Sequence, residues 1–122
     1  MKIAEVNACI KEVQRDLGES LQTTHIVGIQ DGQSIAGFNS DPKLEAIVAQ
    51  ITSFLQGIVK NTAMKQLGEY YFIHLDDESA GVFIVFDEYV WTIIFDTTKT
   101  PMGMVLNVYL PELMEKFEAA MK

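Results

Sequence analysis

The stretch YYFIHLDDESAGVFIVFDEYVWTIIFD, residues 70–96, contains three short apolar runs separated by two acidic turns. The runs cover residues 70–75, 80–86 and 89–95, and each has the length and the β-branched and aromatic content of a strand. The turns are short, so consecutive strands are expected to pair antiparallel as a meander. The last two runs are apolar at both alternating positions, which predicts a sheet covered by helices on both faces.

A hairpin and an N-terminal helix are predicted upstream of the meander. Residues 25–30 (HIVGIQ) and 34–38 (SIAGF) resemble strands, and Asp31-Gly32 between them is a strong hairpin signal. Apolar residues recur at helical spacing over residues 2–18, with the charged residues off that stripe. We therefore expect an amphipathic helix, then a hairpin.

Two further helices complete the predicted order of elements. Pro42, placed after Ser40 and Asp41, is typical of a first helical turn and predicts a long helix over residues 42–66. A last helix is predicted over residues 104–121, with a kink because Pro111 cannot donate a backbone hydrogen bond. The order is helix, hairpin, long helix, meander, helix. It predicts a single α+β domain over residues 1–122.

The predicted long helix contains an uncharged run, AIVAQITSFLQGIV at residues 46–59, which is too short to span a bilayer. At about 100° per residue the large apolar side chains share one broad face, which we expect to pack on the sheet. That face contains Leu44, Ile47, Val48, Ile51, Phe54, Leu55, Ile58 and Val59. The opposite side has small residues instead of charges, namely Ala46, Ala49, Ser53 and Gly57, with Lys60 beyond them.

Two interpretations of the small-residue side stay open. It is a solvated surface that lacks charge by chance, or it packs against a second copy of the helix in a two-fold dimer. The first meander strand favours the dimer, because a long apolar edge strand is an aggregation hazard unless it is paired. The predicted dimer interface contains Ala46, Ala49, Gln50, Ser53, Gly57, Lys60, Tyr70, Phe72 and His74.

Charge and composition narrow the class of partner. The 122 residues include 17 acidic and 9 basic ones, for a formal net charge of −8. This balance disfavours nucleic acid and anionic membranes as partners. The single cysteine excludes an internal disulfide, and neither a signal peptide nor a transmembrane run is recognisable. We therefore expect a cytoplasmic protein.

The sequence predicts no catalytic residue, metal ligand or cofactor site, so an enzyme is the least favoured class. His74 is followed closely by three acidic residues, but adjacent acids in a strand turn are typical of a solvated surface. Cys9 lies beside the apolar stripe of its helix, as a buried thiol does. His25 begins a strand without an evident partner, so we expect it to be structural or exposed.

The chain resembles the roadblock/dynein light-chain family. The resemblance lies in the hairpin VGIQDGQSIAGFNSD (residues 27–41), the meander of residues 70–96, and the return helix MVLNVYLPELMEKF (residues 104–117) after the TPMG loop. It implies a five-stranded, mainly antiparallel sheet with the long helix on one face and the two terminal helices on the other, the profilin-like roadblock architecture. It also implies dimers that form through the long helices and the first meander strand.

The family resemblance also implies a function. Roadblock proteins act as dynein light chains, as scaffold subunits or as regulators of Ras-like small GTPases, and some bacterial relatives stimulate GTP hydrolysis by a partner. The expected function is therefore that of a non-enzymatic dimeric regulator or scaffold. Its expected partners are a second copy, a paralogous roadblock protein, or a Ras-like small GTPase. The alternative is a small-molecule-sensing or motor-associated adaptor domain with the same fold, although the crowded large side chains of the meander disfavour an internal pocket.

Overall fold

Five strands form one antiparallel sheet in the order β2-β1-β5-β4-β3. The computed structural model describes residues 1–63 and 65–122. The hairpin and the meander are both confirmed, and they join through the pairing of β1 with β5 in the middle of the sheet. The strands are β1 (Leu21–Gly28), β2 (Ser34–Phe38), β3 (Tyr70–His74), β4 (Ser79–Phe86) and β5 (Tyr89–Asp96).

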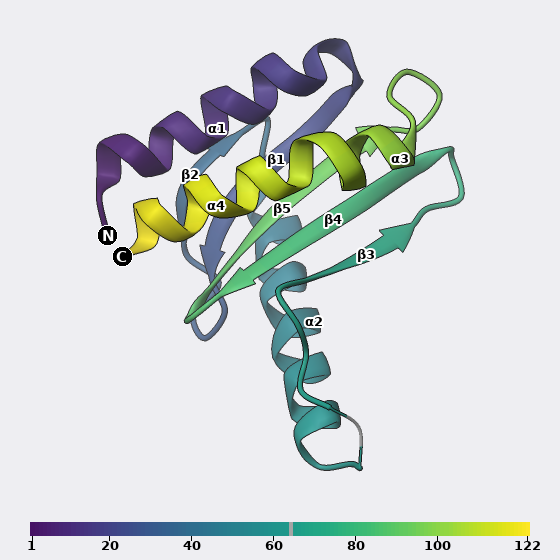
Figure 1. The fold of residues 1–122 in the computed structure, drawn as a ribbon. Helices are drawn as coiled ribbons and strands as arrows, with labels where there is room; N and C mark the ends of the chain where they lie inside the picture. The colour runs from purple at the N-terminus through teal and green to yellow at the C-terminus, as the bar shows by residue number, and fades with distance from the viewer. Residues whose placement is uncertain (64) are drawn as a thin grey trace.

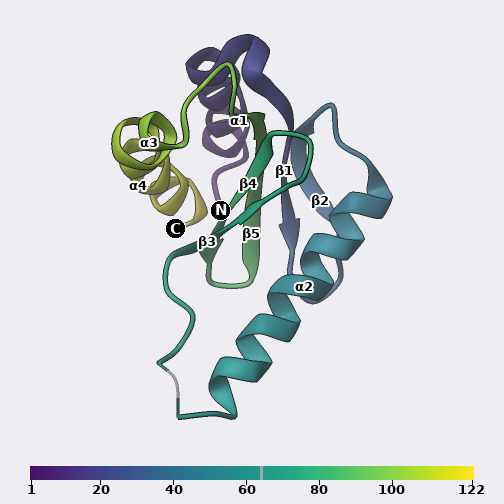
Figure 2. The ribbon, with the colours of Figure 1, turned by 90° about the vertical axis from the view of Figure 1, so that its right-hand side faces the viewer.

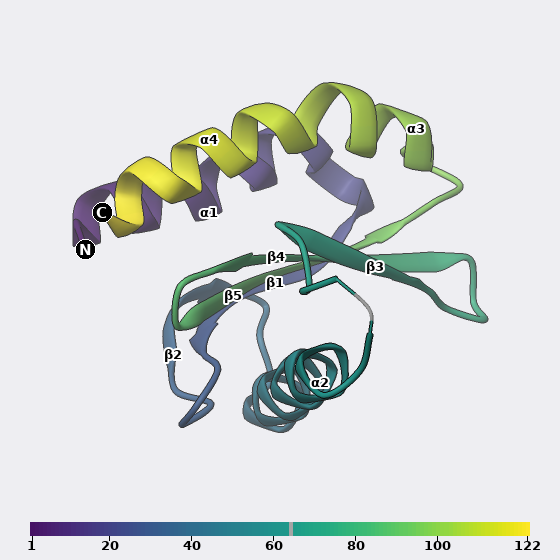
Figure 3. The ribbon, with the colours of Figure 1, turned by 60° about the horizontal axis from the view of Figure 1, so that its bottom comes forward.

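Helices cover both faces of the sheet, as the apolar strands predicted. Figure 3 shows α1 (Ile3–Leu17) and α4 (Leu110–Met121) side by side on one face and α2 (Pro42–Lys60) on the other. In Figure 2 the sheet is seen between these two helical layers. The profilin-like roadblock architecture expected for this chain is therefore confirmed.

The two faces of the sheet have separate apolar cores. Under α1 and α4, the rings of Trp91 and Phe117 lie 5.3 Å apart, and both residues are fully buried. The indole N–H of Trp91 donates to Thr24 Oγ1 at 2.8 Å, so this polar group is satisfied inside the core. Under α2, Tyr71 stacks on Phe83 with ring centroids 4.7 Å apart. Alternate residues of each strand therefore stabilise opposite layers.

Helix α2 begins as predicted but ends sooner. The Asp41 carboxylate accepts the Lys43 N–H at 2.8 Å, which is an N-cap, and Pro42 occupies the first turn. The helix ends at Lys60 rather than at residue 66, because the Asn61 side chain donates to the Gly57 carbonyl at 2.9 Å. Residue 64 of the predicted helix lies outside the described residues. Figures 1 and 2 show that the C-terminal half of α2 extends past the sheet.

The β1–β2 hairpin closes over a loop that packs against α2. The Gly28 N–H donates to the Gln33 carbonyl at 3.0 Å, and Gly32 has φ +69°, a conformation that favours glycine. A Cβ at Gly32 would lie 3.5 Å from the Ala46 Cα and 3.9 Å from the Ala49 Cβ. The small residues of α2 therefore let the loop backbone come close.

The C-terminal helical segment continues through Pro111 without a break. It begins as α3 (Met102–Met104), passes through a π-helical turn, η2 (Val105–Tyr109), and continues as α4. A π turn is wider than an α turn, which relieves the clash between a proline ring and the carbonyl of the preceding turn. The predicted kink is therefore replaced by a local widening of the helix.

The two chain ends lie side by side on the α1 and α4 face (Figure 1). The Lys2 N–H donates to the Ala120 carbonyl at 2.8 Å. Lys116 links the two helices further along, with its Nζ 3.0 Å from Glu12 Oε1 and 3.2 Å from Glu112 Oε1. Within the described part of the chain, no helix has the length and apolar character needed to cross a membrane.

Candidate interaction surface

The outer face of α2 is apolar and uncovered. Ile47, Ile51, Phe54 and Ile58 are 51%, 38%, 68% and 40% exposed, and their spacing of four, three and four residues aligns them along the helix. We call these four side chains the α2 stripe. The prediction that they pack on the sheet is wrong.

Smaller and partly polar residues form the inner face of α2 instead. Glu45, Val48, Ala49 and Thr52 are the buried residues of the helix. Both polar members have partners, because Thr52 shares a 2.7 Å hydrogen bond with the Tyr71 hydroxyl and Glu45 accepts one of 2.6 Å from Ser40. The angular pattern failed because it takes no account of such hydrogen bonds, which let a polar residue face inward at little cost.

The predicted interface residues of α2 fall into two groups. Ala49 is 4% exposed and lies under the hairpin loop, where it also lines the groove between α2 and that loop. The others lie beside the α2 stripe. Gln50 and Ser53 line a groove of about 420 Å³ between α2 and the hairpin loop, and Ala46 contributes to the same groove. Gly57 lines a wider hollow with Phe54 and Ile58. Lys60 is exposed at the helix end.

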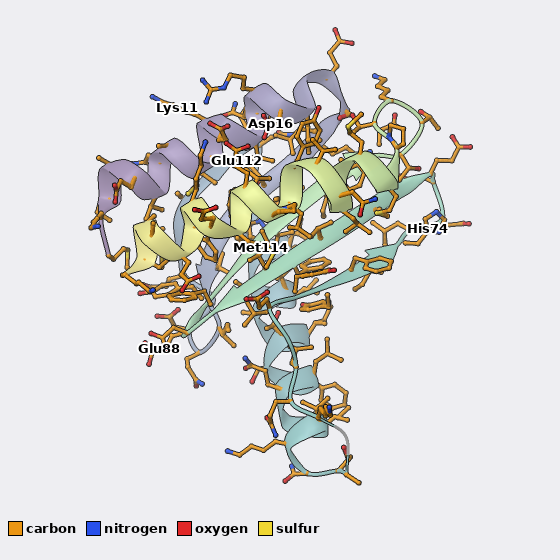
Figure 4. The ribbon with its side chains drawn as sticks, in the orientation of Figure 1. Lys11, Asp16, His74, Glu88, Glu112 and Met114 are labelled. Atoms are coloured by element: carbon orange, nitrogen blue, oxygen red, sulfur yellow. The ribbon has the colours of Figure 1, made fainter. Side chains whose placement is uncertain are left out.

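Strand β3 offers a free edge next to α2. Tyr70, Phe72 and His74 are exposed, whereas Tyr71 and Ile73 face the core under α2. Figure 4 shows His74 at the end of β3 where the chain turns toward β4. Among the described strands only β4 pairs with β3, so one edge of β3 is unpaired. The expectation of an edge strand is confirmed.

The backbone of that edge is turned outward at the same three positions. Val85 donates its N–H to the Glu69 carbonyl at 2.9 Å, and Leu75 donates to the Ser79 carbonyl at 2.7 Å. Residues 69, 71, 73 and 75 therefore direct their backbone groups toward β4. Tyr70, Phe72 and His74 direct theirs away from the sheet, where a further strand can bind.

The sequence did not reveal a buried polar network beneath the start of α2. His25 is fully buried, its Nδ1 lies 3.2 Å from Ser40 Oγ, and Ser40 donates to Glu45. Burial lowers the pKa of His25, and the carboxylate of Glu45 opposes that shift. The signal in the sequence was weak, because Ser40 and Glu45 also fit the ordinary start of a helix.

The described residues contain no group of three or more histidine, cysteine, aspartate or glutamate side chains arranged to hold a metal ion. His74 and the acidic turn after it are exposed, as expected of a solvated turn. Cys9 is buried, also as expected, and burial raises the pKa of its thiol to about 11. The features that distinguish this surface are therefore the α2 stripe and the β3 edge.

Comparison with known proteins identifies the fold. No family model matches the sequence, and no curated protein is significantly similar to it. Among solved structures, Myxococcus xanthus MglB superposes with a TM-score of 0.81 at 17% identity, covering 98% of this chain and 89% of MglB. The gliding protein MglB from Thermus thermophilus gives 0.76 at 14% identity, with coverage of 97% and 89%.

A third solved structure is named for the domain class. The Roadblock/LC7 domain from Streptomyces avermitilis superposes with a TM-score of 0.67 at 10% identity, covering 94% of this chain and 96% of that domain. The chain has the fold of roadblock domains.

Proposed function

We propose that this chain is a homodimeric, non-enzymatic regulator that acts in the cytoplasm by binding a Ras-like small GTPase. The observation that carries the proposal is the α2 stripe, four large apolar side chains exposed along one helix. Exposed apolar patches on a folded domain are typical of protein–protein contacts. The roadblock fold and its similarity to MglB support the same class of function.

Self-association through α2 is supported by the size of the uncovered side chains. Burying one large aliphatic or aromatic side chain contributes about 1.5–3 kcal/mol. In a two-fold dimer each position of the stripe contributes two buried side chains, one from each copy. The C-terminal half of α2 lies beyond the sheet, where a second copy of the helix has room to pack (Figure 2).

The edge of β3 supports the same dimer with a definite register. If two copies of β3 pair antiparallel about a two-fold axis at Phe72, each Phe72 faces its own copy and Tyr70 faces His74. All the outward backbone groups of these three residues then have partners. The hydrogen bond between Thr52 and Tyr71 holds α2 against β3, so both contacts belong to one surface.

Self-association is tested by placing one charge in the stripe. Phe54→Glu puts a carboxylate where an apolar contact is proposed, and Asn7→Asp makes the same charge change on the exposed side of α1. We expect the wild type and Asn7→Asp to be dimers and Phe54→Glu a folded monomer, in light scattering at micromolar concentration. A wild-type monomer, or a dimer unaffected by Phe54→Glu, would contradict the proposed interface.

Regulation of a GTPase is tested by measuring GTP hydrolysis by the GTPase and by this chain separately and together. The chain is used as bait in native lysate, and any recovered Ras-like GTPase is purified. Its GTP turnover is then measured alone, with the wild type and with Phe54→Glu. We expect the wild type to change the turnover and to have none by itself. GTP hydrolysis by the chain alone would refute the non-enzymatic role.

A further inference from the structure

A second groove lies on the opposite face of the sheet from the α2 stripe. It has a volume of about 350 Å³ and lies between α4 and the corner where β3 begins and β4 ends. Figure 4 shows Met114 on the side of α4 that is turned toward β4. The groove opens on the α1 and α4 face, opposite the α2 stripe, and its Glu69 corner adjoins Tyr70 of the β3 edge.

The floor of this groove is apolar and well packed. Phe86 and Phe117 meet edge to face with ring centroids 6.4 Å apart, and Phe117 is fully buried. Met114 and Pro111 form the helical wall above them. Such a floor offers apolar contacts to a bound side chain, because the methionine side chain is flexible and aromatic rings have a large apolar surface.

The rim of the groove is acidic. Glu69 contributes from the residue before β3, and Glu115 and Glu118 contribute from α4, whereas no lysine or arginine lines the groove. Glu118 pairs with Lys122 at 3.0 Å. No ion pair of the described residues includes Glu69 or Glu115. The rim therefore has two exposed carboxylates without a cation.

Two apolar side chains are exposed upstream on the C-terminal helical segment. Met104 and Val108 are 42% and 55% exposed, and Val108 lies in the π turn that precedes Pro111. Such turns occur frequently at functional sites.

We propose that this groove binds a basic peptide segment of a partner protein, in which an apolar residue is flanked by lysine or arginine. The apolar side chain fills the floor, and the flanking cations meet Glu69 and Glu115. The volume suits a few side chains rather than a folded domain. The acidic rim favours a partner with a basic segment over a further copy of this chain, in which 17 acidic residues outnumber 9 basic ones.

The test uses the full chain and a random twelve-residue peptide library displayed on phage. Selected peptides are measured by fluorescence polarisation against Glu69→Gln/Glu115→Gln and against a matched control, Glu19→Gln/Asp77→Asn, in which the same two charges are removed from exposed sites elsewhere. We expect enriched peptides to contain lysine or arginine beside an apolar residue. We also expect binding about fivefold weaker in the groove variant, unchanged in the control, and weaker in high salt.

Three outcomes would overturn the peptide site. They are selected peptides without basic residues, equal binding to the two double variants, and backbone NMR shifts on the α2 stripe instead of on residues 111–118. Assembly of the wild type beyond a dimer that is lost in Glu69→Gln/Glu115→Gln would assign the groove to a second copy and also refute it. Phe54→Glu should keep peptide binding. A failure of the proposed dimer can therefore be told apart from a failure of the peptide site.

Discussion

The side chain of His25 lies inside the protein beneath the start of α2, and its hydrogen bonds define its tautomer. Ser40 donates its only hydroxyl proton to Glu45, so it accepts from Nδ1–H of His25. The other ring nitrogen, Nε2, is buried without a hydrogen-bond partner among the described residues. A proton added there would place a charge in the interior, which is why the pKa of His25 is lowered.

This arrangement predicts that His25 makes the fold sensitive to acid. As pH falls below about 6.5, the unfolded chain binds a proton at this histidine more readily than the folded chain does. The free energy of unfolding therefore decreases, by at most about 1.4 kcal/mol per pH unit. His25→Gln should make stability depend less on pH between about 7 and 5, as measured by urea unfolding at each pH.

The control for this prediction is the other histidine of the chain. His74 is exposed at the end of β3 in the single chain, so His74→Gln made in the Phe54→Glu background should keep the pH dependence of Phe54→Glu alone. Equal slopes for His25→Gln and the wild type would mean that the acid response comes from carboxylates alone.

Cys9 predicts a second residue-scale property, resistance to thiol reagents. It is 2% exposed, and its pKa of about 11 leaves little thiolate at neutral pH. Labelling by a disulfide reagent should proceed only through opening of α1 and accelerate as denaturant is added. In a Cys9→Ala background, Asn7→Cys on the exposed side of α1 should label at once. Equally fast labelling of Cys9 in native buffer would contradict its burial.

These two residues show what the sequence could predict at this scale. The burial of Cys9 followed from the periodicity of its own helix, a local pattern. The environment of His25 depends on β1, on Ser40 in the connection before α2 and on Glu45 of α2, which only the tertiary fold brings together with His25. Nothing in the neighbourhood of residue 25 marks it as buried and hydrogen-bonded to Ser40.

At the scale of elements, α2 shows where pattern and packing diverge. Its existence and its first-turn proline were predicted from local chemistry, which the structure confirms, and of Ser40 and Asp41 the structure makes Asp41 the N-cap. The orientation of the helix was not predicted. The rule that the most apolar face of a helix packs on the core does not hold when that face contacts a partner protein. Small residues face inward here because they accommodate the hairpin loop at Gly32.

Gly57 gives a test of which face of α2 makes contacts. A Cβ added there would meet nothing within 4 Å, and the residue is inside a helix. Gly57→Ala should therefore raise stability by about 1 kcal/mol in chemical denaturation. It should also preserve the dimer, since the proposed contacts come from the stripe.

The comparison variant is Gly81→Ala in the buried strand β4. Its Cβ would lie 2.9 Å from the ring of Phe83, so this substitution should destabilise the fold. A Gly57→Ala protein that is stable but monomeric would instead mean that two helices approach each other closely at Gly57.

At the scale of the whole molecule, the sheet order puts β3 at an edge, and the proposed dimer depends on that edge. Phe72→Pro removes the outward N–H of the central residue without touching the ladder to β4. We expect a folded monomer by circular dichroism and sedimentation. Phe72→Ala keeps the N–H and should weaken the dimer less. A Phe72→Pro dimer of wild-type affinity would exclude pairing of two β3 strands.

The overall architecture was largely predictable because it depends on features that lie close together in the sequence. The acidic turns of residues 70–96 separate three strands. The last two strands are apolar at both alternating positions, which required helices on both faces of the sheet. That the hairpin and the meander share one five-stranded sheet was expected only from the resemblance to the roadblock family, and the pairing of β1 with β5 was not predicted. The π turn before Pro111 and the groove beside α4 depend on side-chain packing, and no local pattern indicated them.

The hydrogen bond between Lys2 and Ala120 has a practical consequence for protein engineering. Because both ends of the chain leave the fold at one corner, a short linker can join them, and new ends can be opened at the exposed turn after β3. A reporter fused to such a circular permutant would lie beside the β3 edge, whereas a reporter fused to the natural ends would lie on the α1 and α4 face. Two differently coloured fusions of this kind would report the meeting of two copies by energy transfer.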